Sequence, residues 1–152
     1  MTDTKTATPE ATQLADLTFK LLANCQEKES RLADQYGLTQ AEFRCLRLFG
    51  TQESSNNKHI AERMNLSPSR LTRIIDGLVT KNYMVREIDA NDRRNMRVTL
   101  SNQGVEIVEK LNKAYVGIHK EILDEIEETQ HVPLITAMTH LLSALEKWIA
   151  KT

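Results

Sequence analysis

The sequence is poor in the residues that make turns, stacked sheets and cross-links. Its 152 residues include only 5 Gly, 3 Pro and 2 Cys, and aromatic residues make up 5% of the chain. Few Gly and Pro indicate few turns and long helices, and few aromatics favour aliphatic helix packing over a β-sandwich. We expect a single domain, because about 150 residues is a usual domain size and a core of that size needs no disulfide or metal.

Long hydrophobic runs are also missing. No stretch approaches the roughly 18 apolar residues of a membrane span, and the opening residues MTDTKTATPEAT contain no apolar segment of a secretory signal. We therefore expect no membrane contact and a cytoplasmic location. Cys25 and Cys45 lie in apolar helical patterns without CxxC spacing, which predicts reduced, inert core thiols.

Motifs of catalysis and metal binding are absent as well. There is no Gly-rich phosphate loop and no nucleophile elbow. The histidines are scattered, with none at metal-ligand spacing from another or from a cysteine: His59, His119, His131 and His140. We expect no enzyme, no metal and no cofactor. The alternative is a zinc sensor with ligands from distant segments, such as Glu27, Glu42 and His119.

Charge is divided unevenly along the chain, although the net charge is −1. Residues 54–104 carry 9 basic and 5 acidic side chains, a net of +4, whereas residues 1–53 and 105–152 have net charges of −2 and −3. A basic module between acidic flanks is typical of a polyanion contact confined to one module. A solvated surface of uneven charge is the alternative.

Apolar residues recur at helical spacing in six segments, which predicts helices at 10–35, 39–49, 58–64, 67–81, 102–129 and 133–150. Capping signals mark their ends. Thr39 and Glu42 match a capping box, and Gly37 and Asn82 stand where a helix ends in a left-handed residue. Ser67 begins the fourth helix as its N-cap.

After the fourth helix, the spacing of apolar residues changes from a period of 3.6 residues to a period of two residues. Residues 84–88 and 97–100 predict two strands, joined by a long charged loop at 89–96. The polar segment 51–57 predicts another loop. The expected fold is mainly α with a small antiparallel β-wing, in which the third and fourth helices form a helix-turn-helix.

The fourth helix carries the first set of candidate DNA-binding residues. A helix that enters the major groove by its N-terminus places first-turn side chains on base edges. Arg reads guanine bidentately, and Ser and Thr serve bases or phosphates. The candidates are Ser67, Ser69, Arg70, Thr72 and Arg73. A solvated helix face is the alternative.

The charged hairpin carries the second set. Arginines on a narrow projection suit the negative potential of a minor groove, and a neighbouring Asp fixes a guanidinium by a charge-assisted bond. The candidates are Asp92, Arg93, Arg94, Asn95 and Arg97. A charged turn that keeps the hairpin soluble is the alternative.

Residues 89–104, DANDRRNMRVTLSNQG, resemble the wing signature of the multiple antibiotic resistance regulator (MarR) family of bacterial transcription factors. That signature is roughly D-P-x-D-x-R, a variable strand and L-[TS]-x-x-G. The matching residues are Asp89, Asp92, Arg94, Leu100, Ser101 and Gly104. Ala90 replaces the usual Pro, Ser101 the commoner Thr and Asn82 a frequent Gly. Residues 38–49 and 66–86 resemble the second helix and the recognition helix of the family.

The resemblance implies a repressor that binds a pseudo-palindromic double-stranded operator as a homodimer. Residues 38–101 would form the winged helix-turn-helix core, and 10–36 and 102–151 the long dimerisation helices, all within one domain spanning 1–152. The alternatives are a monomer, and a winged-helix module that binds a protein partner or binds DNA without ligand control.

The resemblance also implies release from DNA by a small aromatic or phenolic ligand. The candidate effector-binding residues are Phe43, Arg47, His59 and Arg86. Release by an oxidant is less favoured, because the reactive Cys of peroxide-sensing relatives would stand near Ala15 or Asp16.

Overall fold

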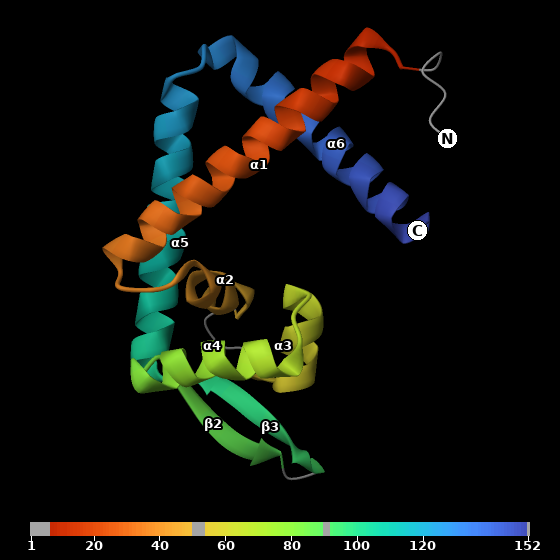
Figure 1. The fold of residues 1–152 in the computed structure, drawn as a ribbon. Helices are drawn as coiled ribbons and strands as arrows, with labels where there is room; N and C mark the ends of the chain where they lie inside the picture. The colour runs from red at the N-terminus through yellow and green to blue at the C-terminus, as the bar shows by residue number, and fades with distance from the viewer. Residues whose placement is uncertain (1–6, 50–53, 90–91, 152) are drawn as a thin grey trace. The chain divides into compact units, whose positions relative to one another are not determined.

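The computed structural model describes residues 7–49, 54–89 and 92–151, with only the backbone described for Ser54, Asp89 and residues 92–95. The fold is mainly α with a small antiparallel sheet, as the sequence predicts (Figure 1). Contacts divide the chain after Asn112 into two compact units. In the part of the chain that is described, no helix is both long and apolar enough to cross a membrane.

The first unit contains the winged core. Its elements, in chain order, are α1 (Pro9–Gln35), α2 (Gln40–Leu48), β1 (Ser54–Asn56), α3 (Asn57–Met64), α4 (Pro68–Thr80), β2 (Met84–Asp89), β3 (Asp92–Leu100) and the first half of α5 (Asn102–Asp124). The described part of the unit packs on a continuous apolar core. The largest fully buried side chains in it are Phe43, Phe49, Leu32, Leu46, Leu71, Ile75, Leu78, Met84 and Leu111.

Capping residues set the helix ends where the sequence predicts them. The Thr39 hydroxyl accepts from Glu42 N (3.1 Å) and the Glu42 carboxylate accepts from Thr39 N (2.8 Å), which completes the capping box of α2. Gly37 and Asn82 have φ of +67° and +65°, in the left-handed region that Gly and Asn tolerate best.

The sheet differs from the expectation in two places. Residues 54–56 of the expected polar loop form β1, which pairs with β3, so the sheet has three strands in the order β1-β3-β2. Ser and Asn are weak strand formers, and here the open edge of β3 imposes the extended conformation. The first residues of that loop, 51–53, lie outside the described residues.

The charged connection of the wing is also shorter than expected. Residues 92–96 belong to β3, where Met96 lies opposite Ile88 and Asp92 opposite Asp89, with a register shift between these two pairs. Only residues 90–91, which are not described, separate the strands. Charged side chains weaken strand propensity, but backbone pairing along a hairpin outweighs that small preference.

The second unit consists of the rest of α5, the 3-10 helix η2 (Glu128–Gln130) and α6 (His131–Lys151). The expected helix at 102–129 ends at Asp124 instead. His131 Nε2 donates to the carbonyls of Leu123 (2.7 Å) and Ile126 (2.8 Å), which supplies a partner at the end of α5. Acidic residues follow that end, and their negative charges interact unfavourably with the negative C-terminal end of the helix dipole, which disfavours continuation of α5.

The two cysteines occupy different surroundings. Cys45 is fully buried, and burial together with the nearby Glu42 carboxylate raises the pKa of its thiol to about 12. Cys25 is only half-buried and accepts a weak bond from Lys28 Nζ (3.8 Å). The expected core position is confirmed for Cys45. It is wrong for Cys25, because the buried part of α1 begins only near Leu32, where α2 packs against it.

Candidate nucleic-acid interface

The helix-turn-helix is formed by α3, a tight turn and α4. The Asn56 side chain caps the start of α3 by accepting from His59 N (2.8 Å). Asn65 then adopts a left-handed conformation (φ 55°), and Leu66 N bonds back to Ala61 O (2.9 Å). Three residues, Asn65 to Ser67, therefore separate α3 from α4.

The start of α4 presents polar side chains to solvent. Ser67 is the N-cap and accepts from Arg70 N (3.4 Å), and Pro68 occupies the first helical position, where it needs no N–H partner. The candidates on this helix are all exposed, while Leu71, Ile75 and Leu78 on the opposite face are buried: Ser67, Ser69, Arg70, Thr72 and Arg73. No hydrogen bond or ion pair to another described residue holds the guanidinium of Arg70 or Arg73.

The wing carries the second candidate set. Strands β2 and β3 project from the end of α4 as a two-stranded ribbon (Figure 1). Arg97 is exposed on β3, in register with Glu87 of β2 and Asn56 of β1. The side chains of Asp92, Arg93, Arg94 and Asn95 lie outside the described residues, although their backbone places them on the outer part of β3. The ten candidates thus come from two neighbouring elements.

The foot of the wing is fixed by a compact set of polar contacts. Ser101 Oγ donates to Asn82 O (2.5 Å) and accepts from Gly104 N (3.0 Å), and Ser101 N donates to Tyr83 O (3.1 Å). A Cβ on Gly104 would overlap Tyr83 O. The serine and glycine of the wing signature therefore join α5 to the turn after α4.

Arg86, one of the effector candidates, also acts at the foot of the wing. Its guanidinium forms an ion pair with Asp76 on the outer side of α4. This pair connects β2 to α4, and it gives Arg86 a carboxylate partner within the protein.

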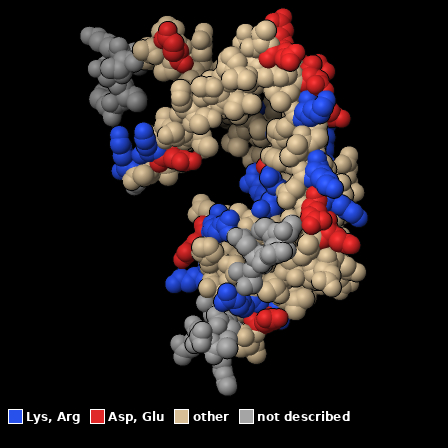
Figure 2. All heavy atoms as spheres, turned by 180° about the vertical axis from the view of Figure 1, so that it is seen from behind, with Lys and Arg blue, Asp and Glu red and all other residues tan. Residues whose placement is uncertain are grey.

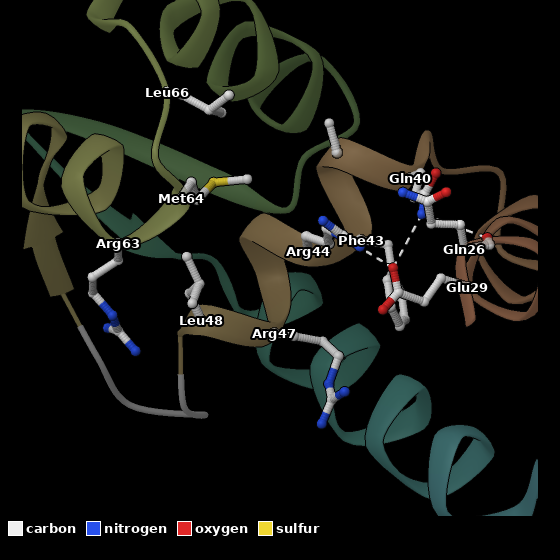
Figure 3. Close-up of a pocket in the computed structure, with 11 residues that line it drawn as sticks. Gln26, Glu29, Gln40, Phe43, Arg44, Arg47, Leu48, Arg63, Met64 and Leu66 are labelled. Carbon is white, nitrogen blue, oxygen red and sulfur yellow. Dashed lines mark hydrogen bonds and ion pairs between the residues drawn. The ribbon is translucent and has the colours of Figure 1, made fainter. Parts of the chain in front are cut away.

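A cavity of about 440 Å³ lies among α1, α2 and the turn between α3 and α4 (Figure 3). Phe43, Leu48, Met64 and Leu66 supply apolar walls. Of the four effector candidates, the structure brings only Phe43 and Arg47 to this cavity; His59 and Arg86 lie elsewhere.

The cavity has lining residues that the sequence did not indicate. Glu29 Oε2 accepts from Arg44 Nε (2.8 Å) and Gln40 Nε2 (3.1 Å), and these side chains converge in Figure 3. Arg63 from the end of α3 lines the cavity as well. No sequence motif could show that the end of α1 packs against α2 at this place.

Basic and acidic side chains mix on the surface of the winged core. On the face that Figure 2 presents, Lys and Arg are interspersed with Asp and Glu. In the described part of the chain, no group of three or more His, Cys, Asp or Glu side chains could hold a metal ion.

An α3-turn-α4 unit followed by a β-hairpin defines a winged helix-turn-helix protein. A sequence model of the MarR family matches residues 38–96. The regulator SarZ of Staphylococcus epidermidis is 31% identical over 98 residues, which cover 64% of this chain and 66% of the relative. The chain belongs to the MarR family.

Solved structures agree with this fold. A cysteine-to-serine mutant of MarR from Escherichia coli matches 85% of this chain and 96% of its own, with a TM-score of 0.74 and 20% identity. The DNA complex of MepR from Staphylococcus aureus matches 87% of this chain and 97% of its own, with a TM-score of 0.68 and 18% identity.

Proposed function

We propose that this chain is a DNA-binding transcription regulator that represses its targets as a homodimer on a pseudo-palindromic operator. One observation carries the proposal: α4 exposes hydroxyl and guanidinium groups over its first two turns, while its apolar side is buried. That arrangement suits entry of the helix N-terminus into a major groove. The positive charge of residues 54–104 supplies the attraction to phosphates.

The wing complements α4 in this proposal. Arg93, Arg94 and Arg97 would contact the adjacent minor groove or its phosphates, with Asp92 and Asn95 orienting them. The ribbon is short and paired along most of its length. It therefore offers a defined support for Arg97, which lies opposite Glu87.

Uncovered apolar faces support the homodimer. On α1, Leu17 is 55% and Phe19 77% exposed, with Leu14, Leu21 and Leu22 beside them. On α6, Trp148 is 62% exposed, and Met138 and Leu145 are exposed as well. Apolar surface of this kind marks an association site, and we assign residues 10–36 and 102–151 to dimerisation. An obligate interface of about 2,000 Å² or more would cover them.

The cavity beside α2 is the proposed effector site. Its volume of about 440 Å³ falls in the range of small-molecule pockets. Phe43 and the other apolar walls suit a ring, and Arg47 and Arg63 suit a phenolate or carboxylate on it. A small aromatic or phenolic ligand would therefore bind next to the α3-α4 turn and shift the helix-turn-helix.

Fluorescence anisotropy tests the proposal. The purified protein is titrated onto the DNA upstream of its own coding sequence, onto a duplex selected from random DNA, and onto shuffled DNA, at two salt concentrations. We expect a preference for a specific duplex of about 10³-fold or more. Equal, strongly salt-dependent binding to all duplexes would contradict specific regulation. No binding to any of them would favour the protein-partner alternative.

A further inference from the structure

One buried carboxylate joins α2 to the end of α4. Glu42, in the first turn of α2, is 4% exposed and is the single charged side chain buried among the described residues that have burial assigned. Its Oε1 accepts from Thr39 N (2.8 Å) and from Lys81 Nζ (2.6 Å). Lys81 is the C-cap residue of α4, so this carboxylate bridges the start of α2 and the end of the recognition helix.

The surface of α4 is shaped to receive this carboxylate. Gly77 lies one turn before Lys81, and a Cβ at Gly77 would overlap Glu42 Oε2. A glycine inside a helix destabilises it relative to alanine, and at this position it leaves room for the Glu42 carboxylate. Glu42, Gly77 and Lys81 therefore form one fitted contact.

Electrostatics explain why the contact among Glu42, Gly77 and Lys81 favours one orientation of α4 against α2. A carboxylate is favoured at the N-terminus of α2 but opposed by the C-terminal dipole of α4. The Lys81 ammonium compensates for both the buried charge and that dipole end. Removing one partner of such a pair leaves an uncompensated charge, so Glu42 and Lys81 hold together. The apolar packing of Leu71, Ile75 and Leu78 has no comparable direction.

We propose that Glu42 is a positioning residue for DNA recognition. Through Lys81 it fixes the orientation of α4 against α2, and so it sets base discrimination without touching DNA. This inference rests on the proposed function. Because Glu42 is buried, it cannot contact DNA itself, and Lys81 is its contact with the proposed recognition helix.

The test uses the full chain and the duplex that wild-type protein selects from random DNA. Glu42→Gln keeps the capping box, because Gln also accepts from the N-cap amide, but removes the charge that holds Lys81. Lys81→Met keeps the stem of the side chain and removes the ammonium. Cys45→Ala and Ile75→Val are the controls, since they lower the Tm by shortening buried side chains on α2 and α4.

We expect Glu42→Gln to lower the ratio of specific to shuffled-DNA affinity by about tenfold, equivalent to one mismatched base pair. Affinity for shuffled DNA and its salt dependence should stay within about twofold. The double variant Glu42→Gln/Lys81→Met should lower this affinity ratio no further than the more affected single variant, because the two groups form one interaction. An unchanged ratio in Glu42→Gln, or an equal loss in the controls, would overturn the inference.

Amide hydrogen exchange without DNA separates this inference from the proposed function. The amides of Lys81 and Tyr83 bond to Gly77 O (3.1 Å) and Leu78 O (2.9 Å) at the end of α4. They should exchange faster in Glu42→Gln than in the controls, and equal rates would refute the positioning role. A wild-type protein without DNA preference would refute the proposed function and the specificity effect, whereas the exchange rates would still decide whether Glu42 holds α4.

Discussion

Two glycines of α5 have opposite surroundings. Gly104 lies against the backbone of Tyr83, where an added Cβ would overlap the carbonyl oxygen, whereas a Cβ on Gly117 would meet no atom within 4 Å. The first glycine is therefore required for close packing at the wing foot. The second only weakens the helix.

These surroundings predict opposite effects of alanine. Gly104→Ala should lower the free energy of unfolding by about 1–3 kcal/mol, because helix and wing foot must move apart. Gly117→Ala should raise it by about 0.5–1 kcal/mol through the better helix propensity of Ala. Denaturant unfolding at one fixed protein concentration measures both. Equal effects of the two substitutions would contradict the close approach at Gly104.

Cys45 predicts a loss of stability at alkaline pH. Its folded pKa is about 12, against an ordinary value of 9.0. Between these values the unfolded thiol releases its proton while the folded one keeps it. The contribution of the protonated Cys45 thiol to the free energy of unfolding is complete below about pH 9. Above that pH it decreases by roughly 1.4 kcal/mol per pH unit.

Comparison with Cys45→Ala isolates that contribution, because other groups titrate equally in both proteins. The pH slope of the wild-type unfolding free energy should exceed that of Cys45→Ala by about one proton between pH 9 and pH 12. Parallel curves would show that Cys45 is not buried as described.

Single residues show what sequence reasoning captures. The caps at Thr39, Ser67 and Asn82 were predictable because they depend on neighbours three or four residues away. The burial of Glu42 and the partial exposure of Cys25 were not, since both depend on packing between helices distant in sequence.

At the scale of elements, the proposed role of α4 in base recognition leads to a specific prediction. If Arg73 reads a guanine, Arg73→Ala should cost about 1–3 kcal/mol at one base position and relax the preference there. Affinity measured on a set of duplexes with single base changes tests this. Arg31→Ala, on the exposed surface of α1 in an ion pair with Glu27, is the matched control and should change no preference. A uniform loss across all duplexes would make Arg73 a phosphate contact.

A different prediction holds for the wing, because a contact to a DNA phosphate carries no sequence preference. Arg94→Ala should weaken binding to every duplex and reduce the slope of log K against log salt by about 0.9 for each lost phosphate contact. Titration at several salt concentrations measures that slope. An unchanged affinity and slope would exclude Arg94 from the interface.

The elements themselves were predicted unevenly. The six α-helices of the described residues were expected from apolar spacing, but β1 and the outer part of β3 were not. Strand pairing joins residues 54–56 to 97–99, about forty residues apart in sequence. The spacing of apolar residues along the chain cannot indicate contacts between such distant segments. The cavity beside α2 was missed for the same reason, apart from Phe43 and Arg47.

At the scale of the whole molecule, charge and apolar surface separate into different segments. The basic residues concentrate in the winged core, while the most exposed large apolar side chains lie largely on α1 and α6. Each segment thus has its own partner in the proposed assembly: DNA for the core and a second copy of the chain for the long helices. Binding to a two-fold operator requires both, because one core reaches only one half-site.

This dependence predicts how a charge placed on α6 changes DNA binding. Leu145 is 49% exposed and is one of several exposed apolar side chains on α6, with Met138, Leu142 and Trp148. In a two-fold dimer, Leu145→Glu introduces two buried charges and should weaken association by at least about 3 kcal/mol, roughly 10²-fold. Sedimentation equilibrium measures this, with Glu146→Gln on the same helix as the control. Since a monomer contacts one half-site, the salt slope should fall to about half. A Leu145→Glu protein with wild-type mass and slope would place the dimer interface away from this face of α6.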